Sequence, residues 1–358
     1  MDLTPTDEHR MLGDAARAFV ERECPTARAR EMDTAAGLDP ALWRAMAALG
    51  WAGLALPEDH GGAGRGMLEL AVLAEQLGRG PVPSPLLASI TLAALPIAWA
   101  GTEAQRRRWL PSLASGEWIG TLALLEPGMD DEWARVTMPA RPSLRGTKVL
   151  VPWAEAADLL LVASADGLVV VEARRGGVRY EPHDALGGEP SYAVTLDGPD
   201  AEPLGPADVA GDVVDRALDH AAIAALAFAV GAAERALELT VQHARDREQF
   251  GRPIGSFQAV AHRCADMRAD VDACRFLAYQ AAWALDRRGR AGLEVAAAKS
   301  YGNDALRRVL IHAHQVHGAI GFSTEHDLHL FTRRAKAFEL SYGGTGHHRE
   351  RLAAAMGL

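Results

Sequence analysis

The spacing of apolar residues changes twice along the chain and divides it into three segments. In the first, from Asp7 to about Ser115, apolar residues recur at the period of an amphipathic helix. Similar patterns cover 40–50, 67–80 and 102–115. We therefore predict an N-terminal all-helical domain over residues 1–116. Its first helix, 7–23, carries one apolar stripe formed by Met11, Leu12, Ala15, Phe19 and Val20.

The second segment, residues 117–206, has shorter apolar runs that are rich in leucine and β-branched residues. Glycine, proline and aspartate separate these runs at the intervals of short strands. Such spacing is typical of a small antiparallel barrel or sandwich, so we predict a central antiparallel β domain. The runs lie at 119–126, 147–152, 158–163, 167–173 and 190–197.

In the third segment, residues 207–358, helical periodicity returns. A helix predicted from 213 to 245 is apolar over most of its surface, as expected for the centre of a bundle. Further helices are predicted at 256–289, 292–318 and 331–341. The predicted fold class is α+β: an N-terminal helical domain, a central small antiparallel β domain and a C-terminal four-helix bundle.

Composition narrows the class of protein. Hydrophobic residues make up 49% and charged residues 23% of the 358, which is typical of soluble globular proteins. The formal net charge of -10 argues against a general nucleic-acid or membrane-surface binder. The apolar runs 88–100 and 221–233 are too short to span a bilayer, so we interpret them as buried helices.

Localisation is predicted from the N-terminus and the cysteines. The first ten residues are polar and acidic, unlike a signal peptide. The three cysteines have no metal-ligand spacing and form an odd, sparse set, as in a reducing compartment. We therefore expect a cytoplasmic protein without a disulfide framework.

Two short motifs resemble ligand sites, but their context favours other interpretations. The glycine-rich run 61–66 lacks the strand–turn–helix setting of a phosphate loop, so we predict a surface loop. His312, His314 and His317 lie close in sequence without tetrahedral zinc spacing or an acidic partner. We predict no metal site.

Two longer stretches, 245–267 and 315–345, carry several motifs in register. They resemble the acyl-CoA dehydrogenase family, and the order of the three segments resembles that fold as well. One motif is Arg–x–x–Phe–Gly, and the other is Gln–x–x–Gly–x–x–Gly–aromatic. They are matched by Arg247, Phe250 and Gly251, and by Gln315, Gly318, Gly321 and Phe322.

The resemblance implies FAD as cofactor and an assembly built from dimers. In that family the two motifs lie across a subunit interface and hold the pyrophosphate and adenosine of the neighbouring subunit's FAD. Arg247 offers a guanidinium fork for phosphate, and Gly318 permits close backbone approach. The cofactor-binding residues implied are Arg247, Phe250, Gln258, Gln315, Gly318, Thr345 and Glu126.

The half-site for the chain's own flavin departs from the family pattern. The family has Thr–Glu–Pro–Gly followed shortly by Gly–Ser–Asp; here Leu125 replaces the threonine, and 129–132 reads MDDE. Leucine has no hydroxyl for the flavin, and Asp130 and Asp131 add negative charge near the cofactor phosphates. Pro152 stands where another flavin-contacting threonine is expected and removes a backbone donor as well.

The catalytic glutamate of the family is also missing. A positioned carboxylate takes the weakly acidic α-proton of the thioester. Its usual place is Tyr–Glu–Gly–Thr, where this chain has Gly343. A second family position falls near Ala221, which has no carboxylate either. Asp219 and His347 remain as candidates for a displaced base, whereas Glu339 is expected to be a solvent-facing or ion-paired helix residue.

These departures predict the base-lacking subunit of an α2β2 acyl-CoA dehydrogenase, which grips FAD held mainly by a homologous partner subunit. Members of this kind often act on bulky CoA thioesters, including steroid side-chain fragments, and the family's acceptor is electron-transferring flavoprotein. The alternatives are a homo-oligomeric FAD enzyme with a displaced base or other acyl-CoA chemistry, and a flavin-free scaffold or acyl-CoA binder.

Overall fold

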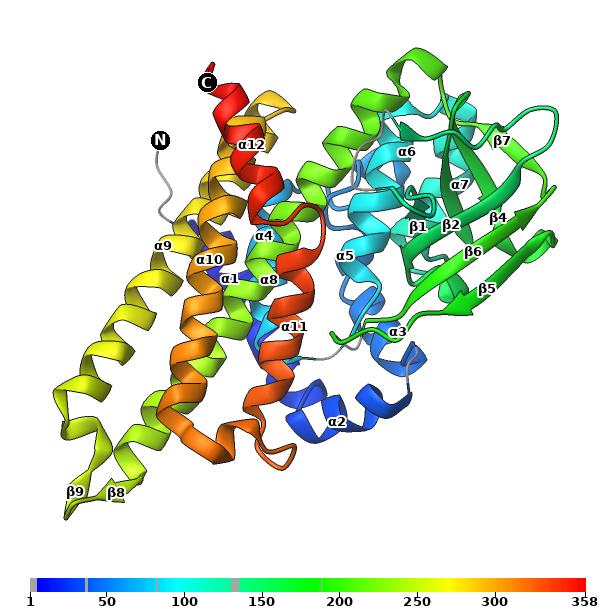
Figure 1. The fold of residues 1–358 in the computed structure, drawn as a ribbon. Helices are drawn as coiled ribbons and strands as arrows, with labels where there is room; N and C mark the ends of the chain where they lie inside the picture. The colour runs from blue at the N-terminus through cyan, green and yellow to red at the C-terminus, as the bar shows by residue number, and fades with distance from the viewer. Residues whose placement is uncertain (1–4, 36–37, 82, 130–134, 188) are drawn as a thin grey trace. The chain divides into compact units, whose positions relative to one another are not determined.

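The computed structural model describes residues 5–35, 38–81, 83–129, 135–187 and 189–358. The chain forms two compact units, drawn in Figure 1. The first, here the bundle unit, comprises 1–34, 67–82 and 222–358; the second, the sheet unit, comprises 35–66 and 83–221. The boundaries 1–116, 117–206 and 207–358 stay a prediction.

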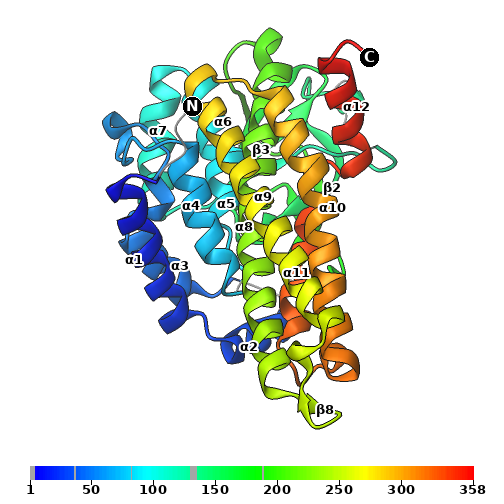
Figure 2. The same ribbon diagram turned by 90° about the vertical axis from the view of Figure 1, so that its left-hand side faces the viewer.

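The bundle unit contains the long C-terminal helices. Helix α8 begins in the sheet unit and is predominantly buried from Ala221 to Ala233, as its apolar surface predicted. Helix α9 packs along α10, which also contacts α11 and α12, while α4 joins α1 to α9 (Figure 2). The helices are α1 Asp7–Glu23, α2 Thr26–Ala35, α4 Met67–Gly78, α8 Ala210–Asp246, α9 Gln258–Arg288, α10 Gly292–His317, α11 Leu328–Leu340 and α12 Thr345–Ala355.

Two glycines bring α4 and α8 into close contact. A Cβ atom on Gly231 of α8 would lie 1.8 Å from the Glu75 carbonyl oxygen, and one on Gly78 of α4 would lie 1.9 Å from that of Phe228. No side chain fits at such distances, so each glycine faces the backbone of the other helix. The crossing therefore requires glycine at both positions.

The sheet unit carries two small sheets and short helices. One sheet has the order β1-β3-β4-β7 and the other β2-β6-β5. Its helices are α3 Pro40–Ala48, α5 Leu86–Ala88, a π-helical segment Ser89–Ala94, α6 Leu95–Ala100 and α7 Glu103–Ala114. Its strands are β1 Gly120–Ala123, β2 Arg145–Pro152, β3 Leu159–Ser164, β4 Gly167–Glu172, β5 Val178–Pro182, β6 Ser191–Asp197 and β7 Ala201–Pro203.

The strand pairing corrects one detail of the prediction. The central block is antiparallel except for β1 and β3, which pair in parallel from Gly120 opposite Leu159 to Ala123 opposite Val162. Alternation of apolar residues does not encode strand direction. Every residue of β1 and β3 is buried. Packing against both faces of the sheet therefore decides which strands become neighbours.

No helix among the described residues is long and apolar enough to cross a membrane. The run 88–100 forms α5, the π-helical segment and α6, and it is buried up to Ile97 within the sheet unit. The glycine-rich run 61–66 forms a turn and an extended segment before α4, with left-handed backbone at Gly61 and Gly64. This geometry agrees with the predicted surface loop.

Candidate functional site

The first motif forms a tight hairpin between α8 and α9. Strands β8 Glu248–Gln249 and β9 Arg252–Pro253 pair, and Phe250 and Gly251 make the two-residue turn. Both turn residues have positive φ, +55° and +76°, as a type I′ hairpin turn requires. Glycine adopts this conformation readily, whereas phenylalanine is strained by it.

The strained phenylalanine is also the most exposed large apolar side chain of the hairpin. Phe250 is 93% exposed, and its only ring contact among the described aromatic pairs is with Phe257, at 6.1 Å between centroids. Arg247 and Gln258 flank the hairpin and are exposed. Strained backbone of this kind clusters at functional sites, so the hairpin is a candidate for one.

The second motif lines a pocket of about 330 Å³ in the bundle unit. Gly318 caps α10 with φ +65° and ψ −143°, a conformation that favours glycine, and a Cβ there would meet open space. Gln315 is exposed one turn earlier. The full lining is Arg307, Leu310, Ile311, His314, Gln315, Gly318, Phe322, Thr332, Lys336 and Glu339.

A charged cluster forms part of the same pocket wall. Glu339 on α11 accepts from Arg307 Nε on α10 at 3.1 Å and pairs with Lys336 Nζ at 2.8 Å. Glu339 is 8% exposed, so of the two expected alternatives the ion-paired helix residue is confirmed and the solvent-facing one is wrong. Two cations and one carboxylate leave one net positive charge there, which suits an anionic ligand group.

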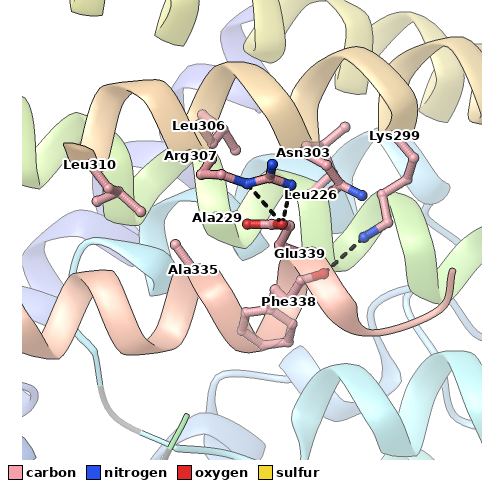
Figure 3. A pocket seen from close by; sticks show the side chains of 10 residues that line it. All are labelled: Leu226, Ala229, Lys299, Asn303, Leu306, Arg307, Leu310, Ala335, Phe338 and Glu339. Atoms are coloured by element: carbon pink, nitrogen blue, oxygen red, sulfur yellow. Dashed lines mark hydrogen bonds and ion pairs between the residues drawn. The ribbon is translucent and has the colours of Figure 1, made fainter. Parts of the chain in front are cut away.

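A smaller cavity of about 10 Å³ lies behind this cluster (Figure 3). Buried Lys299 donates from Nζ to the Phe338 carbonyl oxygen at 2.8 Å, joining α10 to α11. The Asn303 Nδ2 atom is buried without a hydrogen-bond partner among the described residues. The cavity has room for about one water molecule, which this amide can hydrogen-bond.

Gly343, which replaces the expected glutamate, lies in a backbone segment that does not accommodate a side chain. Tyr342 and Gly343 have φ of +58° and +94°. A Cβ atom on Gly343 would lie 2.5 Å from His347 Cδ2 and 2.8 Å from His348 Nε2. The two imidazoles, from the start of α12, therefore occupy the space next to the backbone where a glutamate would begin.

The two histidines differ in their surroundings. His348 is fully buried and donates from Nε2 to the Tyr342 carbonyl oxygen at 2.9 Å. Burial, with the nearby charges of Lys299 and Arg351, lowers its pKa to about 3, so it stays neutral near neutral pH. His347 is half-buried and its ring meets that of His348 edge-on at 5.1 Å.

Thr345 has a structural contact within the bundle unit. Its hydroxyl donates to Asp304 Oδ1 at 3.2 Å, which fastens the first turn of α12 to α10. Asp304 also pairs with Arg349. The cofactor-binding role predicted for Thr345 stays a prediction.

In the sheet unit, Glu126 is held by internal partners. Its carboxylate accepts from the backbone of Thr137 and Met138 at 3.1 and 2.9 Å and pairs with the buried Lys148 at 2.9 Å. Burial alone raises the pKa of Glu126, but these hydrogen bonds outweigh it and hold the pKa at about 2. Lys148 also donates to the Leu124 carbonyl oxygen, so the pair closes the loop after β1.

Leu125 and Pro152 stand where the resemblance predicts threonines, and Leu150 lies near Pro152 on β2. Leu125 is half-buried, and Leu150 is 60% exposed with φ +53° at a bulge in β2. The Pro152 carbonyl oxygen accepts from Thr121 at 2.7 Å, which ties β2 to β1. Leu125 and Pro152 have no side-chain donor, and Pro152 also lacks a backbone N–H. Asp130 and Asp131 lie outside the described residues.

The remaining candidates have separate locations. Asp219 is buried on α8, 7% exposed, within the part of that helix that belongs to the sheet unit. His347 belongs to the bundle unit, as does Gly343. Among the described residues no group of histidine, cysteine, aspartate and glutamate side chains has the arrangement of a metal site.

Sequence reasoning missed the charged wall of the larger pocket and a stack of histidine rings near it. In the sequence, Arg307 and Lys336 look like ordinary charged residues of helices. Their shared contact with Glu339 depends on how α10 packs on α11. His243, His317 and His326 come from three parts of the chain. The only sequence signal was position: His243 precedes Arg247 by one helical turn, and His317 lies inside the second motif.

Two family models match the chain. The model for the acyl-CoA dehydrogenase N-terminal domain matches residues 6–117, and that for the acyl-CoA dehydrogenase C-terminal domain matches 211–357. The acyl-CoA dehydrogenase IpdE2 of Mycobacterium tuberculosis is 33% identical over 337 residues, which are 93% of this chain and 92% of that protein.

Two of the solved structures with the same fold each carry the names of two proteins. The Tcur3481-Tcur3483 steroid ACAD matches with a TM-score of 0.88 at 33% identity, covering 98% of each chain. The ChsE4-ChsE5 complex from Mycobacterium tuberculosis matches with a TM-score of 0.90 at 31% identity, covering 100% of this chain and 99% of that one. The predicted fold class is thereby confirmed.

Proposed function

Because the chain belongs to the acyl-CoA dehydrogenase family, whose cofactor is FAD, we propose that it is a subunit that lacks the catalytic glutamate and completes the FAD site of a homologous partner. The assembly is an α2β2 heterotetramer that desaturates a CoA thioester between its α and β carbons. The partner supplies the base and the intact flavin pocket.

One observation carries this proposal: the backbone at Gly343 has no room for a side chain. Its φ of +94° disfavours every residue with a Cβ, and two imidazoles fill the adjoining space. A glycine that merely replaced glutamate would leave open space at its Cβ. In this turn the two imidazoles therefore lie where the side chain of a glutamate at 343 would begin.

The residues of the two motifs fit the FAD of the partner. The exposed Arg247 and Gln258 are available for pyrophosphate, and Phe250 projects from its hairpin. The pocket at Gln315 and Gly318 offers 330 Å³ and an open glycine for the adenosine. When bound, FAD accepts the β-hydrogen of the thioester; this chain's residues only bind and orient it.

The class of substrate is proposed from the relatives. The steroid description belongs to the Tcur3481-Tcur3483 protein, and it supports a bulky acyl-CoA here because that chain matches over 98% of its length. Electron-transferring flavoprotein is proposed as the acceptor on the family likeness alone.

The test is FAD stoichiometry and mass of the purified chain, alone and after co-expression with a homologous subunit that has Tyr–Glu–Gly–Thr. We expect a colourless chain alone and a heterotetramer with FAD at half stoichiometry per chain. One tightly bound FAD per chain in a homo-oligomer would contradict the proposal. Absence of FAD in the assembled complex would favour a flavin-free scaffold.

The alternative of a homo-oligomeric enzyme with a displaced base is favoured by one observation. His347 Cδ2 lies 2.5 Å from the point where a side chain at 343 would begin, so its half-buried imidazole is next to the vacated position. In that case the chain alone binds FAD and turns over an acyl-CoA, and His347→Gln abolishes turnover while FAD stays bound.

A further inference from the structure

Three histidine rings in the bundle unit stack in series. His243 on α8 lies parallel to His317 at the end of α10, with 4.6 Å between ring centroids and 21° between planes. His317 also meets His326, in the turn before α11, edge-on with 4.7 Å between ring centroids and 62° between planes. We call His243, His317 and His326 the histidine stack.

The histidine stack lies where the two cofactor motifs begin. His243 accepts at its backbone oxygen from Arg247 N at 2.9 Å, so the ring sits one turn before the Arg247 hairpin. His317 stands between Gln315 and Gly318 in the second motif. His326 accepts at Nδ1 from Leu328 N at 3.1 Å and so holds the first turn of α11.

We propose that His243 and His317 are positioning residues that hold the Arg247 hairpin and the Gln315–Gly318 turn in the geometry that grips the cofactor, and that protonation of the histidine stack loosens this grip. The cofactor part of the proposal rests on the function proposed above; the coupling of the two motifs by the stack does not.

The surroundings of His317 and His243 favour the neutral imidazole. His317 is 6% exposed, donates from Nδ1 to the Ala313 carbonyl oxygen at 2.8 Å, and has no partner at Nε2 among the described residues. Burial lowers its pKa to about 4, and the neighbouring histidines, when charged, add to this. Burial also lowers the pKa of His243. A proton on His317 would be a buried charge beside two other titratable rings.

The surrounding charges do not offset such a proton. The groups that act on His243 and His317 are Asp246 at the end of α8, Arg247 just after it, His314 on α10 and His326 in the turn before α11. His329 on α11 acts on His314. Asp246 opposes the lowering of the His243 pKa, but Arg247 and His326 both favour it. His314, whose Nε2 bonds Thr332 at 2.8 Å, has a lowered pKa through burial.

The sign of the pH dependence follows from these directions. A histidine with a pKa of about 4 when stacked and an ordinary pKa near 6.5 when released binds more protons in the released state. The contribution of the stack to holding the two motifs in place is therefore complete above pH 6.5 and is lost as the pH falls toward 4. At pH 5.5 one such group favours release by about tenfold.

The coupling is tested by hydrogen–deuterium exchange of the full chain at pH 7.5 and 5.5, corrected for intrinsic exchange. In the wild type we expect segments 243–251 and 315–326 to lose protection together at pH 5.5, relative to the centre of α9. His317→Phe, which keeps a ring without a titrating nitrogen, should be equally protected at both pH values. His317→Ala should lose protection at both, and the exposed His262→Phe on α9 should behave as the wild type.

The cofactor readout uses the assembled complex with the homologous partner. We expect FAD dissociation constants about tenfold higher at pH 5.5 than at 7.5 in the wild type and nearly unchanged in His317→Phe. Wild-type segments that keep their protection at pH 5.5 would overturn the proposal even if no variant folds. Coupled loss of protection with unchanged FAD affinity would uphold the stack as a clamp of the two motifs and refute the cofactor role proposed for them.

Discussion

His348 lies against Gly343 at a distance that leaves no place for a side chain: a Cβ atom on Gly343 would be 2.8 Å from the histidine Nε2. That nitrogen donates to the carbonyl oxygen of Tyr342, the residue before the glycine. The imidazole thereby holds the left-handed turn at 342–343 from the inside. Gly343 and the buried histidine are two parts of one local structure.

Introducing the missing carboxylate should fail for this reason. In Gly343→Glu the new side chain must adopt a left-handed backbone conformation and displace His347 and His348. We expect a loss of about 2 kcal/mol in the free energy of unfolding and no gain in dehydrogenase activity of the chain alone. Urea denaturation and an acyl-CoA dye-reduction assay measure the two effects.

The matched control is Gly346→Glu, three residues later. Gly346 is exposed, its Cβ would meet no atom within 4 Å, and a carboxylate in the first turn of α12 interacts favourably with the helix dipole. Its stability should equal or exceed that of the wild type. Strong dehydrogenase activity in Gly343→Glu would show that the turn at 342–343 accepts a working base, contrary to our account.

The α4–α8 crossing should not tolerate a single added methyl group. In Gly231→Ala the Cβ would overlap the Glu75 carbonyl oxygen, so the helices must separate. We expect a loss of about 3 kcal/mol or more, measured by thermal unfolding. Gly13→Ala on α1 is the control, since its Cβ would meet Val72 at an ordinary 3.6 Å, and it should gain about 0.5 kcal/mol. Equal effects of both substitutions would contradict the close approach.

Arg247→Ala should weaken FAD binding by the assembled complex. A charge-assisted hydrogen bond to phosphate contributes about 1.5–3 kcal/mol, so the dissociation constant should rise about 10- to 100-fold. Flavin fluorescence on titration with FAD measures it. Arg245→Ala, equally exposed two residues earlier, should leave the affinity unchanged. If both variants bind FAD like the wild type, the Arg247 hairpin has no part in the grip.

Glu126 should make the stability of the chain depend on acid. Its pKa is about 2 in the folded chain against an ordinary value of 4.5, so its contribution is present above pH 4.5 and lost as the pH falls toward 2. Relative to the wild type, Glu126→Gln should be less stable by about 2 kcal/mol at pH 7, and this difference should shrink as the pH falls below 4.5.

Urea midpoints of the two proteins at pH 7, 4 and 3 measure this difference. Glu181→Gln, an exposed position on β5, is the control and should match the wild type throughout. The difference in stability between Glu126→Gln and the wild type could instead stay constant from pH 7 to 3. That result would mean that the contacts described do not hold the carboxylate in its charged form.

Much of the architecture was predictable because it is written in local periodicity. The helix predicted from 213 to 245 is α8, 210–246, and the strand-like runs contain β1, β4 and β6 and overlap β2 and β3. Helices α2 and α12 were not predicted, because their apolar stripes are weak. The parallel pairing of β1 with β3 was missed, since the run of apolar residues is the same for either direction.

The candidate site was predictable only as a set of residue types. The two motifs and the glycine at 343 can be read from the sequence, since they depend only on residue identity and spacing. The contacts of Glu126 with Thr137, Met138 and Lys148 are not, because they depend on how the loop after β1 folds back on β2.

The sequence by itself determined the order of the elements, the family motifs and the loss of the carboxylate, because each is a local property of the chain. Only the tertiary structure decided that Gly343 has no room for a side chain, that Arg307 and Lys336 meet at Glu339, and that three histidines stack between the two motifs. These are relations between residues of different elements, and their distances are set by how the helices and turns pack together.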